Sequence, residues 1–509
     1  KLANPSEKLA ESLEVLREAQ ERRGAAIRSR DLSRTHRERL LKNGFLQEVM
    51  KGWYVPARPD EDVGESTAWY ASYWDFCAAY LNARFGQNWS LSPEQSLLIH
   101  AGNWRVPPQL LVRAPKGGNK PVSLPHGTSL FEVRAELPEF GQSVDVSGLR
   151  LFSVPAALVE ATAGLYRQYP TDMRVALSMI RDASEVLSIL LEGGHSVVAG
   201  RLAGAFRNIG KDRIADEIIK AMRAAGYKVY EEDPFQTQAP FRINACERSP
   251  YVNRIRLMWQ QMRADIDGRF PEARGGAGST KQYLAHVDDV YVTDAYHSLS
   301  IEGYRVSPEL IERVRGGNWN PDANEEDRKH RDTLAARGYW QAFQAVRESV
   351  SKVLEGENAG AVAENDHSTW YRELFAPSVT AGLLKPGDLA GYRNDQVYIR
   401  RSMHVPLRQE AVRDCMPAFF ELLHEEQDPA VRVVLGHFVF VYIHPYMDGN
   451  GRIGRFLMNV MLAAGGWPWT IIPVEQRETY MAALEEASVK QNIVPFTEFL
   501  GGLVSAAQN

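Results

Sequence analysis

The sequence predicts a mainly α-helical protein whose C-terminal half is all helical and whose N-terminal part mixes helices with short strands. Apolar residues recur at helical spacing over 251–348, and apolar helical runs cover 431–443 and 456–464. In the N-terminal part, short apolar runs are separated by turns that contain proline and glycine. A chain of 509 residues is long enough for about two to four domains.

The first 56 residues predict three helices followed by a hairpin. Helices are expected over 7–22, 25–32 and 34–42, the third with a serine N-cap. The stretch 45–55 then alternates in the manner of a hairpin with a Lys-Gly turn. Helix, helix, helix and hairpin is the element order of a winged helix, so residues 1–56 are expected to form a winged-helix-like domain.

The third of these predicted helices is strongly basic. Arg34, Arg37 and Lys42 are candidate DNA contacts, because clustered positive charge on an exposed helix binds phosphates. The stretch 29–55 resembles the winged-helix head of AbiEi-type antitoxins, which implies DNA binding. A protein–protein or scaffold module with a solvated basic helix explains the same residues equally well.

The remainder of the N-terminal half is expected to be an α+β region over 57–230 that is compatible with such a protein. A small sheet is predicted before about residue 150, and helices are predicted after it. Residues 231–250 lack periodicity and are interrupted by proline, so they are predicted to link this region to a helical domain over 251–509.

Composition describes an ordinary soluble protein with 44% hydrophobic residues, 24% charged residues and a net charge of −5. The cysteines Cys77, Cys246 and Cys415 are far apart, with neither metal-site nor disulfide-framework spacing, which favours a reducing compartment. No apolar run approaches eighteen residues and no signal peptide is visible. We therefore expect a cytoplasmic protein without a membrane partner.

The most informative segment is 444–455, His-Pro-Tyr-Met-Asp-Gly-Asn-Gly-Arg-Ile-Gly-Arg, between two apolar helical runs. Proline at position 445 disfavours helical geometry at His444, so the first helix should end there. The Gly-Asn-Gly stretch should form a tight loop, and the next helix should start near Arg452. Free backbone N–H groups at that start, with the helix dipole behind them, form an anion site.

The charged side chains of this segment suit phosphate chemistry. Arg452 and Arg455 are three residues apart, so they share one helix face and can hold two phosphates of one chain. Asp448 is a hard oxygen ligand suited to Mg²⁺. His444 at the mouth can accept a proton.

The segment resembles the signature of the Fic family, His-Pro-Phe-x-Asp/Glu-Gly-Asn-Gly-Arg-x-x-Arg, with Tyr446 in place of the usual phenylalanine. The resemblance extends over about 251–503. It implies an all-helical domain with a small β-hairpin flap that transfers AMP from Mg·ATP to a Ser, Thr or Tyr hydroxyl of a target protein. The implied roles are a base at His444, a metal ligand at Asp448, and nucleotide or phosphate contacts at Gly449, Asn450, Gly451, Arg452 and Arg455.

A second stretch, Ser298-Leu-Ser-Ile-Glu302-Gly303, resembles the inhibitory motif of Fic proteins, Ser/Thr-x-x-x-Glu-Gly/Asn. The resemblance implies that Glu302 pairs with Arg455 and occupies the place of the γ-phosphate. A solvated acid at a helix C-terminus, followed by a glycine cap, is the alternative interpretation.

Two further segments complete the resemblance. Alternation at 397 and 399 predicts a short strand, and Gln396, Val397, Tyr398 and Ile399 resemble the Fic flap, whose backbone pairs with the target. An ordinary surface hairpin explains this segment as well. Residues 472–488 resemble the stretch that lines the adenine pocket in Fic proteins, and Tyr480, Met481 and Ser488 are the candidate adenine contacts.

The sequence thus predicts a protein adenylyltransferase that is autoinhibited by Glu302, with ATP as substrate, Mg²⁺ as cofactor and a protein target as partner. Removal of AMP in the same site, or transfer of another phosphate-containing group, remains open. So does a DNA-binding regulator of toxin–antitoxin type. Oligomerisation is also left open.

Overall fold

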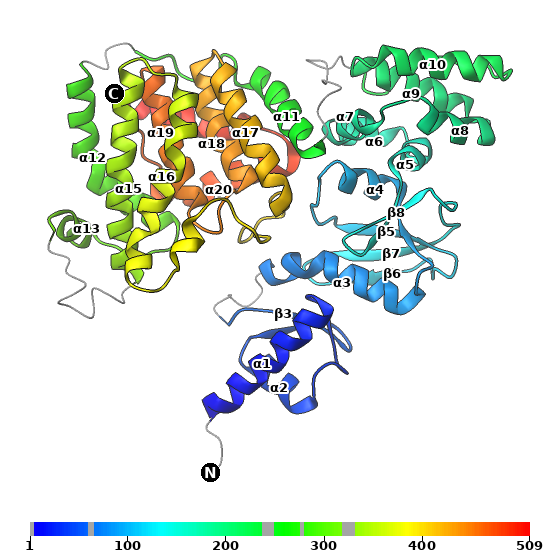
Figure 1. Ribbon diagram of the computed structural model, residues 1–509, viewed down its shortest axis with the longest axis horizontal. Coiled ribbons are helices and arrows are strands. Elements are labelled where there is room, and N and C mark those ends of the chain that lie inside the picture. Colours follow the sequence, from blue (N-terminus) through cyan, green and yellow to red (C-terminus); the bar gives the residue numbers. More distant parts are fainter. Residues whose placement is uncertain (1–4, 60–65, 237–248, 275–278, 318–330, 509) are drawn as a thin grey trace. The chain divides into compact units, whose positions relative to one another are not determined.

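The computed structural model describes residues 5–59, 66–236, 249–274, 279–317 and 331–508. The chain divides into two compact units, one of residues 1–250 with 398–405 and one of residues 251–397 with 406–509 (Figure 1). Most of the predicted linker, 237–248, lies outside the described residues. In the described part of the chain, no helix is both long and apolar enough to cross a bilayer.

The first unit begins with a small sheet of strand order β1-β3-β2, in which both pairs are antiparallel. The short helix predicted over 25–32 is wrong. Ile27, at the start of this stretch, is fully buried and pairs with Tyr54 as a strand, because the chain must return from the first helix to the sheet edge. The elements are α1 (Pro5–Arg23), β1 (Ile27–Arg28), α2 (Arg34–Lys42), β2 (Leu46–Met50) and β3 (Trp53–Pro56).

The rest of the first unit mixes helices and strands up to residue 152 and is helical from 154 to 224, in agreement with the α+β region that the sequence predicts. A four-stranded sheet has the order β4-β5-β7-β6, with β5 and β7 parallel, and β8 pairs with β9. The elements are α3 (Thr67–Phe85), β4 (Ser90–Leu91), α4 (Pro93–His100), β5 (Gln109–Ala114), β6 (Pro121–Ser123), β7 (Ser129–Arg134), β8 (Ser143–Val146), β9 (Leu149–Phe152), α5 (Val154–Glu160), α6 (Gly164–Gln168), α7 (Pro170–Met179), α8 (Ser184–Gly193), α9 (Ser196–Asn208) and α10 (Asp212–Ala224).

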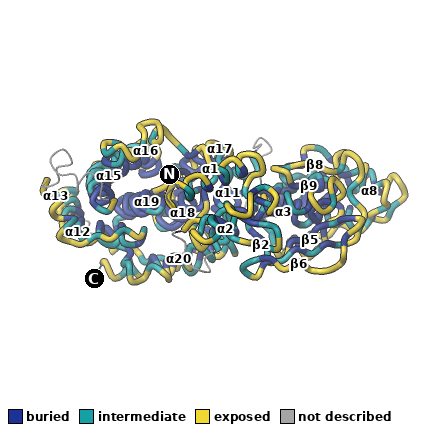
Figure 2. The backbone as a smooth tube through the Cα atoms, turned by 90° about the horizontal axis from the view of Figure 1, so that it is seen from below, coloured by how far each residue is buried: buried dark blue, intermediate teal, exposed yellow. Residues whose placement is uncertain are grey.

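The second unit is a helical bundle built around α18 (Pro429–Ile443) and α19 (Asn450–Gly465), which pack against each other. Both central helices are almost entirely buried, as the dark tubes in Figure 2 show. An apolar helix without a polar face belongs in the interior of a bundle. The surrounding elements are α11 (Pro250–Ile266), α12 (Thr280–Ile301), α13 (Pro308–Arg315), α15 (Arg331–Leu354), α16 (Ala359–Thr380), η1 (Pro386–Leu389), α17 (Gln409–Glu425), η2 (Val474–Gln476), α20 (Arg477–Lys490) and α21 (Val494–Ala507).

The segment between η1 and α17 contains no strand in any of its described residues, so the β-hairpin predicted for the flap is wrong. In this segment, side-chain hydrogen bonds take the place of the backbone hydrogen bonds that a hairpin would form. The Gln396 amide donates to the carbonyl of Pro406 at 2.9 Å, and the guanidinium of Arg393 reaches the carbonyl of Leu407. The two arms of the loop are therefore joined by side chains from one arm to carbonyls of the other.

Gly338 tests the packing that supports the central helices. A Cβ at this position of α15 would lie 1.9 Å from the carbonyl oxygen of Leu374 on α16. Gly338→Ala should therefore lower the free energy of unfolding by about 1–3 kcal/mol. Gly502→Ala, in α21 of the same unit, meets no atom within 4 Å and should raise it by roughly 0.5–1 kcal/mol. Urea unfolding of both full-length variants would measure these opposite signs, and equal midpoints would contradict the packing argument.

Candidate active site at the 444–455 loop

The loop begins where α18 ends, at His444, as the sequence predicts. His444 has left-handed backbone angles, φ 55° and ψ 62°, which are uncommon outside glycine. Its Nδ1 lies 3.1 Å from the carbonyl oxygen of Val441, and because a carbonyl only accepts, Nδ1 carries the proton. The Nε2 atom of the same ring therefore has a lone pair.

The surroundings of His444 keep its imidazole neutral. Burial lowers the pKa of His444 to about 4, against the opposing effect of the bond to Val441, and the nearby Arg393 guanidinium lowers it further. At neutral pH the ring is therefore a neutral acceptor at Nε2, which is the state that a general base requires.

The interior of the loop is closed by Asn450. Its Oδ1 accepts from the backbone N–H of Tyr446 at 2.9 Å, and its Nδ2 donates to the carbonyl of the same residue at 2.8 Å. Asn450 is only 2% exposed. The sequence led us to expect the Asn450 amide at the phosphates; the structure instead engages both of its polar atoms in holding the loop.

Two neighbouring residues fix the shape of the loop against α16. Gly449 has φ 82°, and a Cβ there would lie 2.8 Å from the ring of Phe375, so both backbone angle and space require glycine. The Tyr446 ring stacks on Tyr371 with centroids 3.8 Å apart. The hydroxyl that distinguishes Tyr446 from phenylalanine is buried and has no hydrogen-bond partner among the described residues.

Arg452 lies in the first turn of α19 and is only 1% exposed. Its guanidinium carbon is 5.2 Å from the ring centres of both Tyr304 and Phe375, and its Nη2 donates to Oδ1 of Asp448 at 3.2 Å. The Nε atom of Arg452 is buried and has no partner in the described part of the chain. The carboxylate of Asp448 is by contrast 62% exposed.

The structure brings Glu302 and Arg455 into contact, as the resemblance implied. Nη2 of Arg455 lies 2.7 Å from Oε1 of Glu302 and 3.0 Å from the carbonyl of Ser298, whose hydroxyl accepts from Nε at 2.9 Å. Glu302 also caps α12 and is followed by Gly303 at φ 84°, so the helix end of the alternative interpretation is present as well. A Cβ on Gly451 would lie 2.4 Å from Oε1 of Glu302, so the ion pair depends on glycine there.

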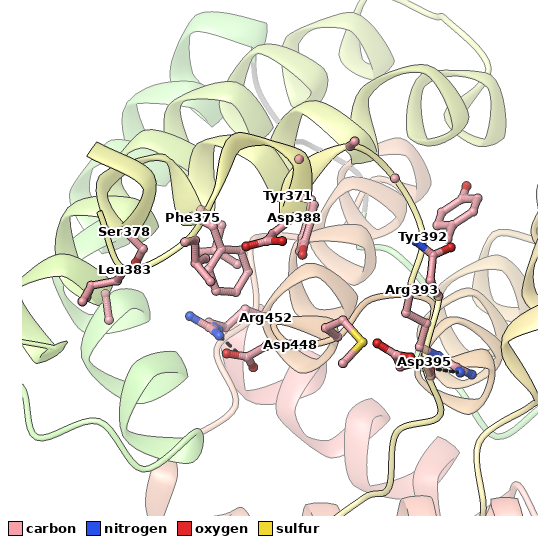
Figure 3. Close-up of a pocket in the computed structure, with 18 of the residues that line it drawn as sticks. Tyr371, Phe375, Ser378, Leu383, Asp388, Tyr392, Arg393, Asp395, Asp448 and Arg452 are labelled. Atoms are coloured by element: carbon pink, nitrogen blue, oxygen red, sulfur yellow. Dashed lines mark hydrogen bonds and ion pairs between the residues drawn. The ribbon is translucent and has the colours of Figure 1, made fainter. Parts of the chain in front are cut away.

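A pocket of about 990 Å³ opens beside the loop (Figure 3). Asp448 and Arg452 form one side of it, while α16 contributes Tyr371 and Phe375 (Figure 3). Sequence reasoning did not identify these aromatic side chains. Tyr304 follows the inhibitory motif directly and could have been proposed, whereas no pattern in α16 distinguishes its pocket residues from core. Further lining residues are Arg331, Asp388, Tyr392, Arg393, Asn394, Asp395 and Arg413.

The predicted adenine contacts do not line this pocket. Tyr480 is buried in the core, and its hydroxyl shares a 2.7 Å hydrogen bond with Nε2 of His437. Met481 and Ser488 are partly exposed on the same helix, α20. The structure thus keeps Tyr480 inside the bundle, where its ring packs near Phe499.

The donor set for a metal is small. Within the described ranges, no group of three or more His, Cys, Asp or Glu side chains could hold a metal ion. A single exposed carboxylate, that of Asp448, nevertheless suits Mg²⁺, which keeps several waters and binds through one or two carboxylates together with substrate phosphates.

The predicted DNA contacts lie on α2 in the first unit. Arg34 donates to the carboxylate of Glu38 at 2.6 Å, and Arg37 donates to the carbonyl of Ser29 at 2.9 Å. Lys42 is exposed. Two of the three predicted cations are therefore already engaged within the first unit.

The fold and the loop together define a helical-bundle protein with two buried arginines at the start of a central helix. Residues 364–462 match the Fic/DOC family. The chain is 30% identical over 216 residues to the protein adenylyltransferase Fic of Drosophila grimshawi, over 42% of this chain and 41% of that protein. It is 28% identical over 234 residues to the same-named protein of Aedes aegypti, over 45% and 43%.

The chain therefore spans about two-fifths of the length of these curated relatives. Among solved structures, it is similar to a Fic domain containing signaling protein from Bacteroides thetaiotaomicron, with 15% identity and a TM-score of 0.34, over 50% of this chain and 93% of that one. It is also similar to Fic-1 from C. elegans, with 18% identity and a TM-score of 0.35, over 64% and 90%.

Asn450 should act as a structural residue of the loop. Asn450→Ala leaves a buried N–H and a buried carbonyl of Tyr446 without partners, at a cost of about 1–3 kcal/mol each. Met447→Ala, in the same loop but 52% exposed, should change stability by less than about 0.5 kcal/mol. Thermal unfolding of both variants tests this, and a melting temperature for Asn450→Ala equal to that of Met447→Ala would show that the amide does not hold the loop.

Proposed function

We propose that this protein is a Fic-type adenylyltransferase that moves AMP from Mg·ATP to a Ser, Thr or Tyr hydroxyl of a target protein. The family match over 364–462 and the names of the curated relatives support this proposal. The observation that carries it is the pair of buried guanidiniums at the start of α19. Among the described residues, Nε of Arg452 and Nη1 of Arg455 have no hydrogen-bond partner.

The electrostatics of this pair favour the binding of an anion. The N-terminus of a helix is its positive end, so two buried cations in the first turns of α19 are unfavourable unless negative charge neutralises them. The carboxylates in contact are both partly in solvent, Asp448 at 62% and Glu302 at 25% side-chain exposure. A polyphosphate supplies more negative charge and more acceptor oxygens than either carboxylate, and Arg is suited to bind it in forked geometry.

In the proposed reaction, Nε2 of His444 accepts the proton of the target hydroxyl. The hydroxyl oxygen forms a bond to the α-phosphorus, and the bond from that phosphorus to the bridging oxygen of pyrophosphate breaks. Backbone N–H groups of the loop at Gly449 and Gly451 stabilise charge on the α-phosphate. Arg452 holds the β-phosphate and Arg455 the γ-phosphate.

Asp448 would hold Mg²⁺, which would neutralise negative charge on the phosphates. The residues 396–399 would lie alongside the target segment, which is strand addition and reads backbone shape more than sequence. In this scheme the side chains bind and orient the nucleotide, and His444 alone moves a proton.

We also propose that Glu302 inhibits this reaction by occupying Arg455. The carboxylate holds Nη2 of Arg455 at 2.7 Å, so a γ-phosphate must displace Glu302 to reach that guanidinium. Removing one partner of a buried pair normally leaves an uncompensated charge. Here the phosphate of the substrate would supply the compensation.

Glu302→Gly should therefore raise AMP transfer, including transfer onto the enzyme itself, because it frees Arg455 for the γ-phosphate. Arg455→Ala should stay inactive in the Glu302→Gly background. ADP, which lacks a γ-phosphate, should bind wild type and Glu302→Gly with similar affinity, whereas ATP should favour the variant. Labelled ATP in cell lysate, with calorimetric titration of both nucleotides, measures these effects.

Glu302→Gln is the matched control, because it keeps the volume and an acceptor oxygen but removes the charge, and it should lie between wild type and Glu302→Gly. Equal transfer and equal ATP affinity in all forms would show that the segment 298–303 is only a capped helix end without an inhibitory role. If the protein instead removes AMP, Glu302 would orient the attacking water, and Glu302→Gly would abolish that activity rather than raise transfer.

The rate should depend on pH as expected for a base whose pKa is lowered. Neutral His444 is the active form, so with a pKa of about 4 its activity persists at acid pH and is lost only as the pH falls toward that value. An ordinary histidine would lose half its activity near pH 6.5. The kcat of Glu302→Gly, measured from pH 5 to 8 at saturating Mg·ATP, should stay nearly flat, and His444→Ala should lose about 10²–10⁴-fold. A midpoint near 6.5 would refute this description of the base.

A further inference from the structure

Arg393 is a buried cation that the proposed reaction does not use. It is 2% exposed and lies between η1 and α17. Its Nε donates to the carbonyl of His444 at 2.7 Å, and its Nη2 approaches the carbonyl of Ile443 at 3.4 Å. Its own backbone N–H donates to the carbonyl of Pro445 at 2.9 Å. Three consecutive carbonyls of the turn that presents His444 are thus held by one residue.

The same guanidinium also reaches the loop between η1 and α17. Its Nη1 donates to the carbonyl of Asp395 at 2.9 Å and its Nη2 to the carbonyl of Leu407. Arg393 and Asp395 line the 990 Å³ pocket, whereas His444 does not. One side chain therefore joins the pocket wall, both arms of the loop and the end of α18.

These contacts suit arginine specifically. The carbonyls of Ile443 and His444 belong to the negative end of α18, where a cation is favourable. Burial lowers the pKa of Arg393 to about 10, so the group remains charged at neutral pH. A planar fork can donate to carbonyls in several directions, which the compact ammonium of lysine cannot reproduce.

We propose that Arg393 is a positioning residue that holds His444 in its left-handed turn and sets the 394–407 loop in register with it. Taken with the proposed function, Arg393 fixes where the base stands relative to the wall that borders the target. It touches neither the reacting atoms nor the residues proposed to bind phosphates, so its loss should lower turnover and leave nucleotide binding nearly unchanged.

The test compares Arg393→Gln and Arg393→Lys in the Glu302→Gly background. Misplacing a base by about 1 Å costs roughly 10²-fold in rate. We expect kcat to fall about 100-fold in Arg393→Gln and about 10-fold in Arg393→Lys, with KM for ATP within about two-fold of the parent. Arg432→Gln is the matched control. Arg432 lies at the start of α18 and also donates to a backbone carbonyl, that of Glu426. It should keep the parent's kcat.

A second readout does not depend on transfer. The rate at which diethyl pyrocarbonate modifies His444, followed by peptide mass spectrometry against pH, reports the pKa of its imidazole. The charged groups that act on this ring are Arg393, Glu302 and Asp448, beside the carbonyl of Val441. Removing the Arg393 charge should raise the midpoint toward 6.5 in Arg393→Gln but not in Arg393→Lys or Arg432→Gln.

The outcomes separate the two proposals. All variants are compared below the onset of their own thermal unfolding, so a loss of stability does not imitate a loss of positioning. Full kcat in Arg393→Lys, or an unchanged His444 midpoint in Arg393→Gln, overturns the positioning role. If the Glu302→Gly parent transfers no AMP, the proposed function fails, and the His444 midpoint alone then decides whether Arg393 controls the base.

Discussion

The structure of the second unit depends on burying two cations at the positive end of a helix. Arg452 and Arg455 both lie in the first turns of α19, where the helix dipole and their mutual repulsion oppose them. Each is compensated by contacts with other groups of the unit. Asp448 and the ring of Tyr304 contact Arg452, and Glu302 contacts Arg455. The end of α12 supplies the carboxylate beside Arg455.

The helix α12 is firmly anchored before its C-terminal end, so only Glu302 at that end is able to exchange partners at Arg455. Asp294, two turns before Glu302, accepts from the hydroxyl of Tyr339 at 2.6 Å and from the indole of Trp469 at 3.0 Å. Burial raises the pKa of Asp294 even though these bonds favour its charged form. The partly exposed carboxylate of Glu302 can therefore leave Arg455 without disturbing the buried part of the helix. Within the proposed function, carboxylate and phosphate compete for one guanidinium on an otherwise fixed frame.

The sequence predicted the parts of this site that depend on local chemistry. Proline at 445 placed the end of α18, the glycines placed the loop, and the three-residue spacing placed both arginines on one face. The sequence did not predict the contacts that side chains make with backbone carbonyls. The bonds of the Asn450 amide to the backbone of Tyr446 are one example, because the sequence suggested only a phosphate contact for this amide. Arg393 was missed because its partners are carbonyls, which every residue carries and no pattern marks.

The two wrong predictions of secondary structure, at 25–32 and at the flap, have the same origin in tertiary contacts. The stretch 25–32 has helical composition, but Ile27 is needed as a strand to cover the core beneath α1. The flap alternates like a strand, but Gln396 and Arg393 satisfy the opposite arm before a ladder can form. In each case a tertiary partner outweighed a local preference.

The His444 turn is held from two sides, and this bears on how regulation could work. Asn450 hydrogen-bonds to the backbone within the loop, and Arg393 hydrogen-bonds to the three carbonyls of residues 443–445. A left-handed residue costs energy and persists only where its surroundings over-determine it. A base fixed in this way is preorganised, so removing Glu302 need not rebuild it. In the proposed inhibition, the contact that would change is the ion pair between Glu302 and Arg455, beside which Gly451 carries no Cβ. Within the proposed function, inhibition by Glu302 would act on the position of the nucleotide and leave the geometry of the base unchanged.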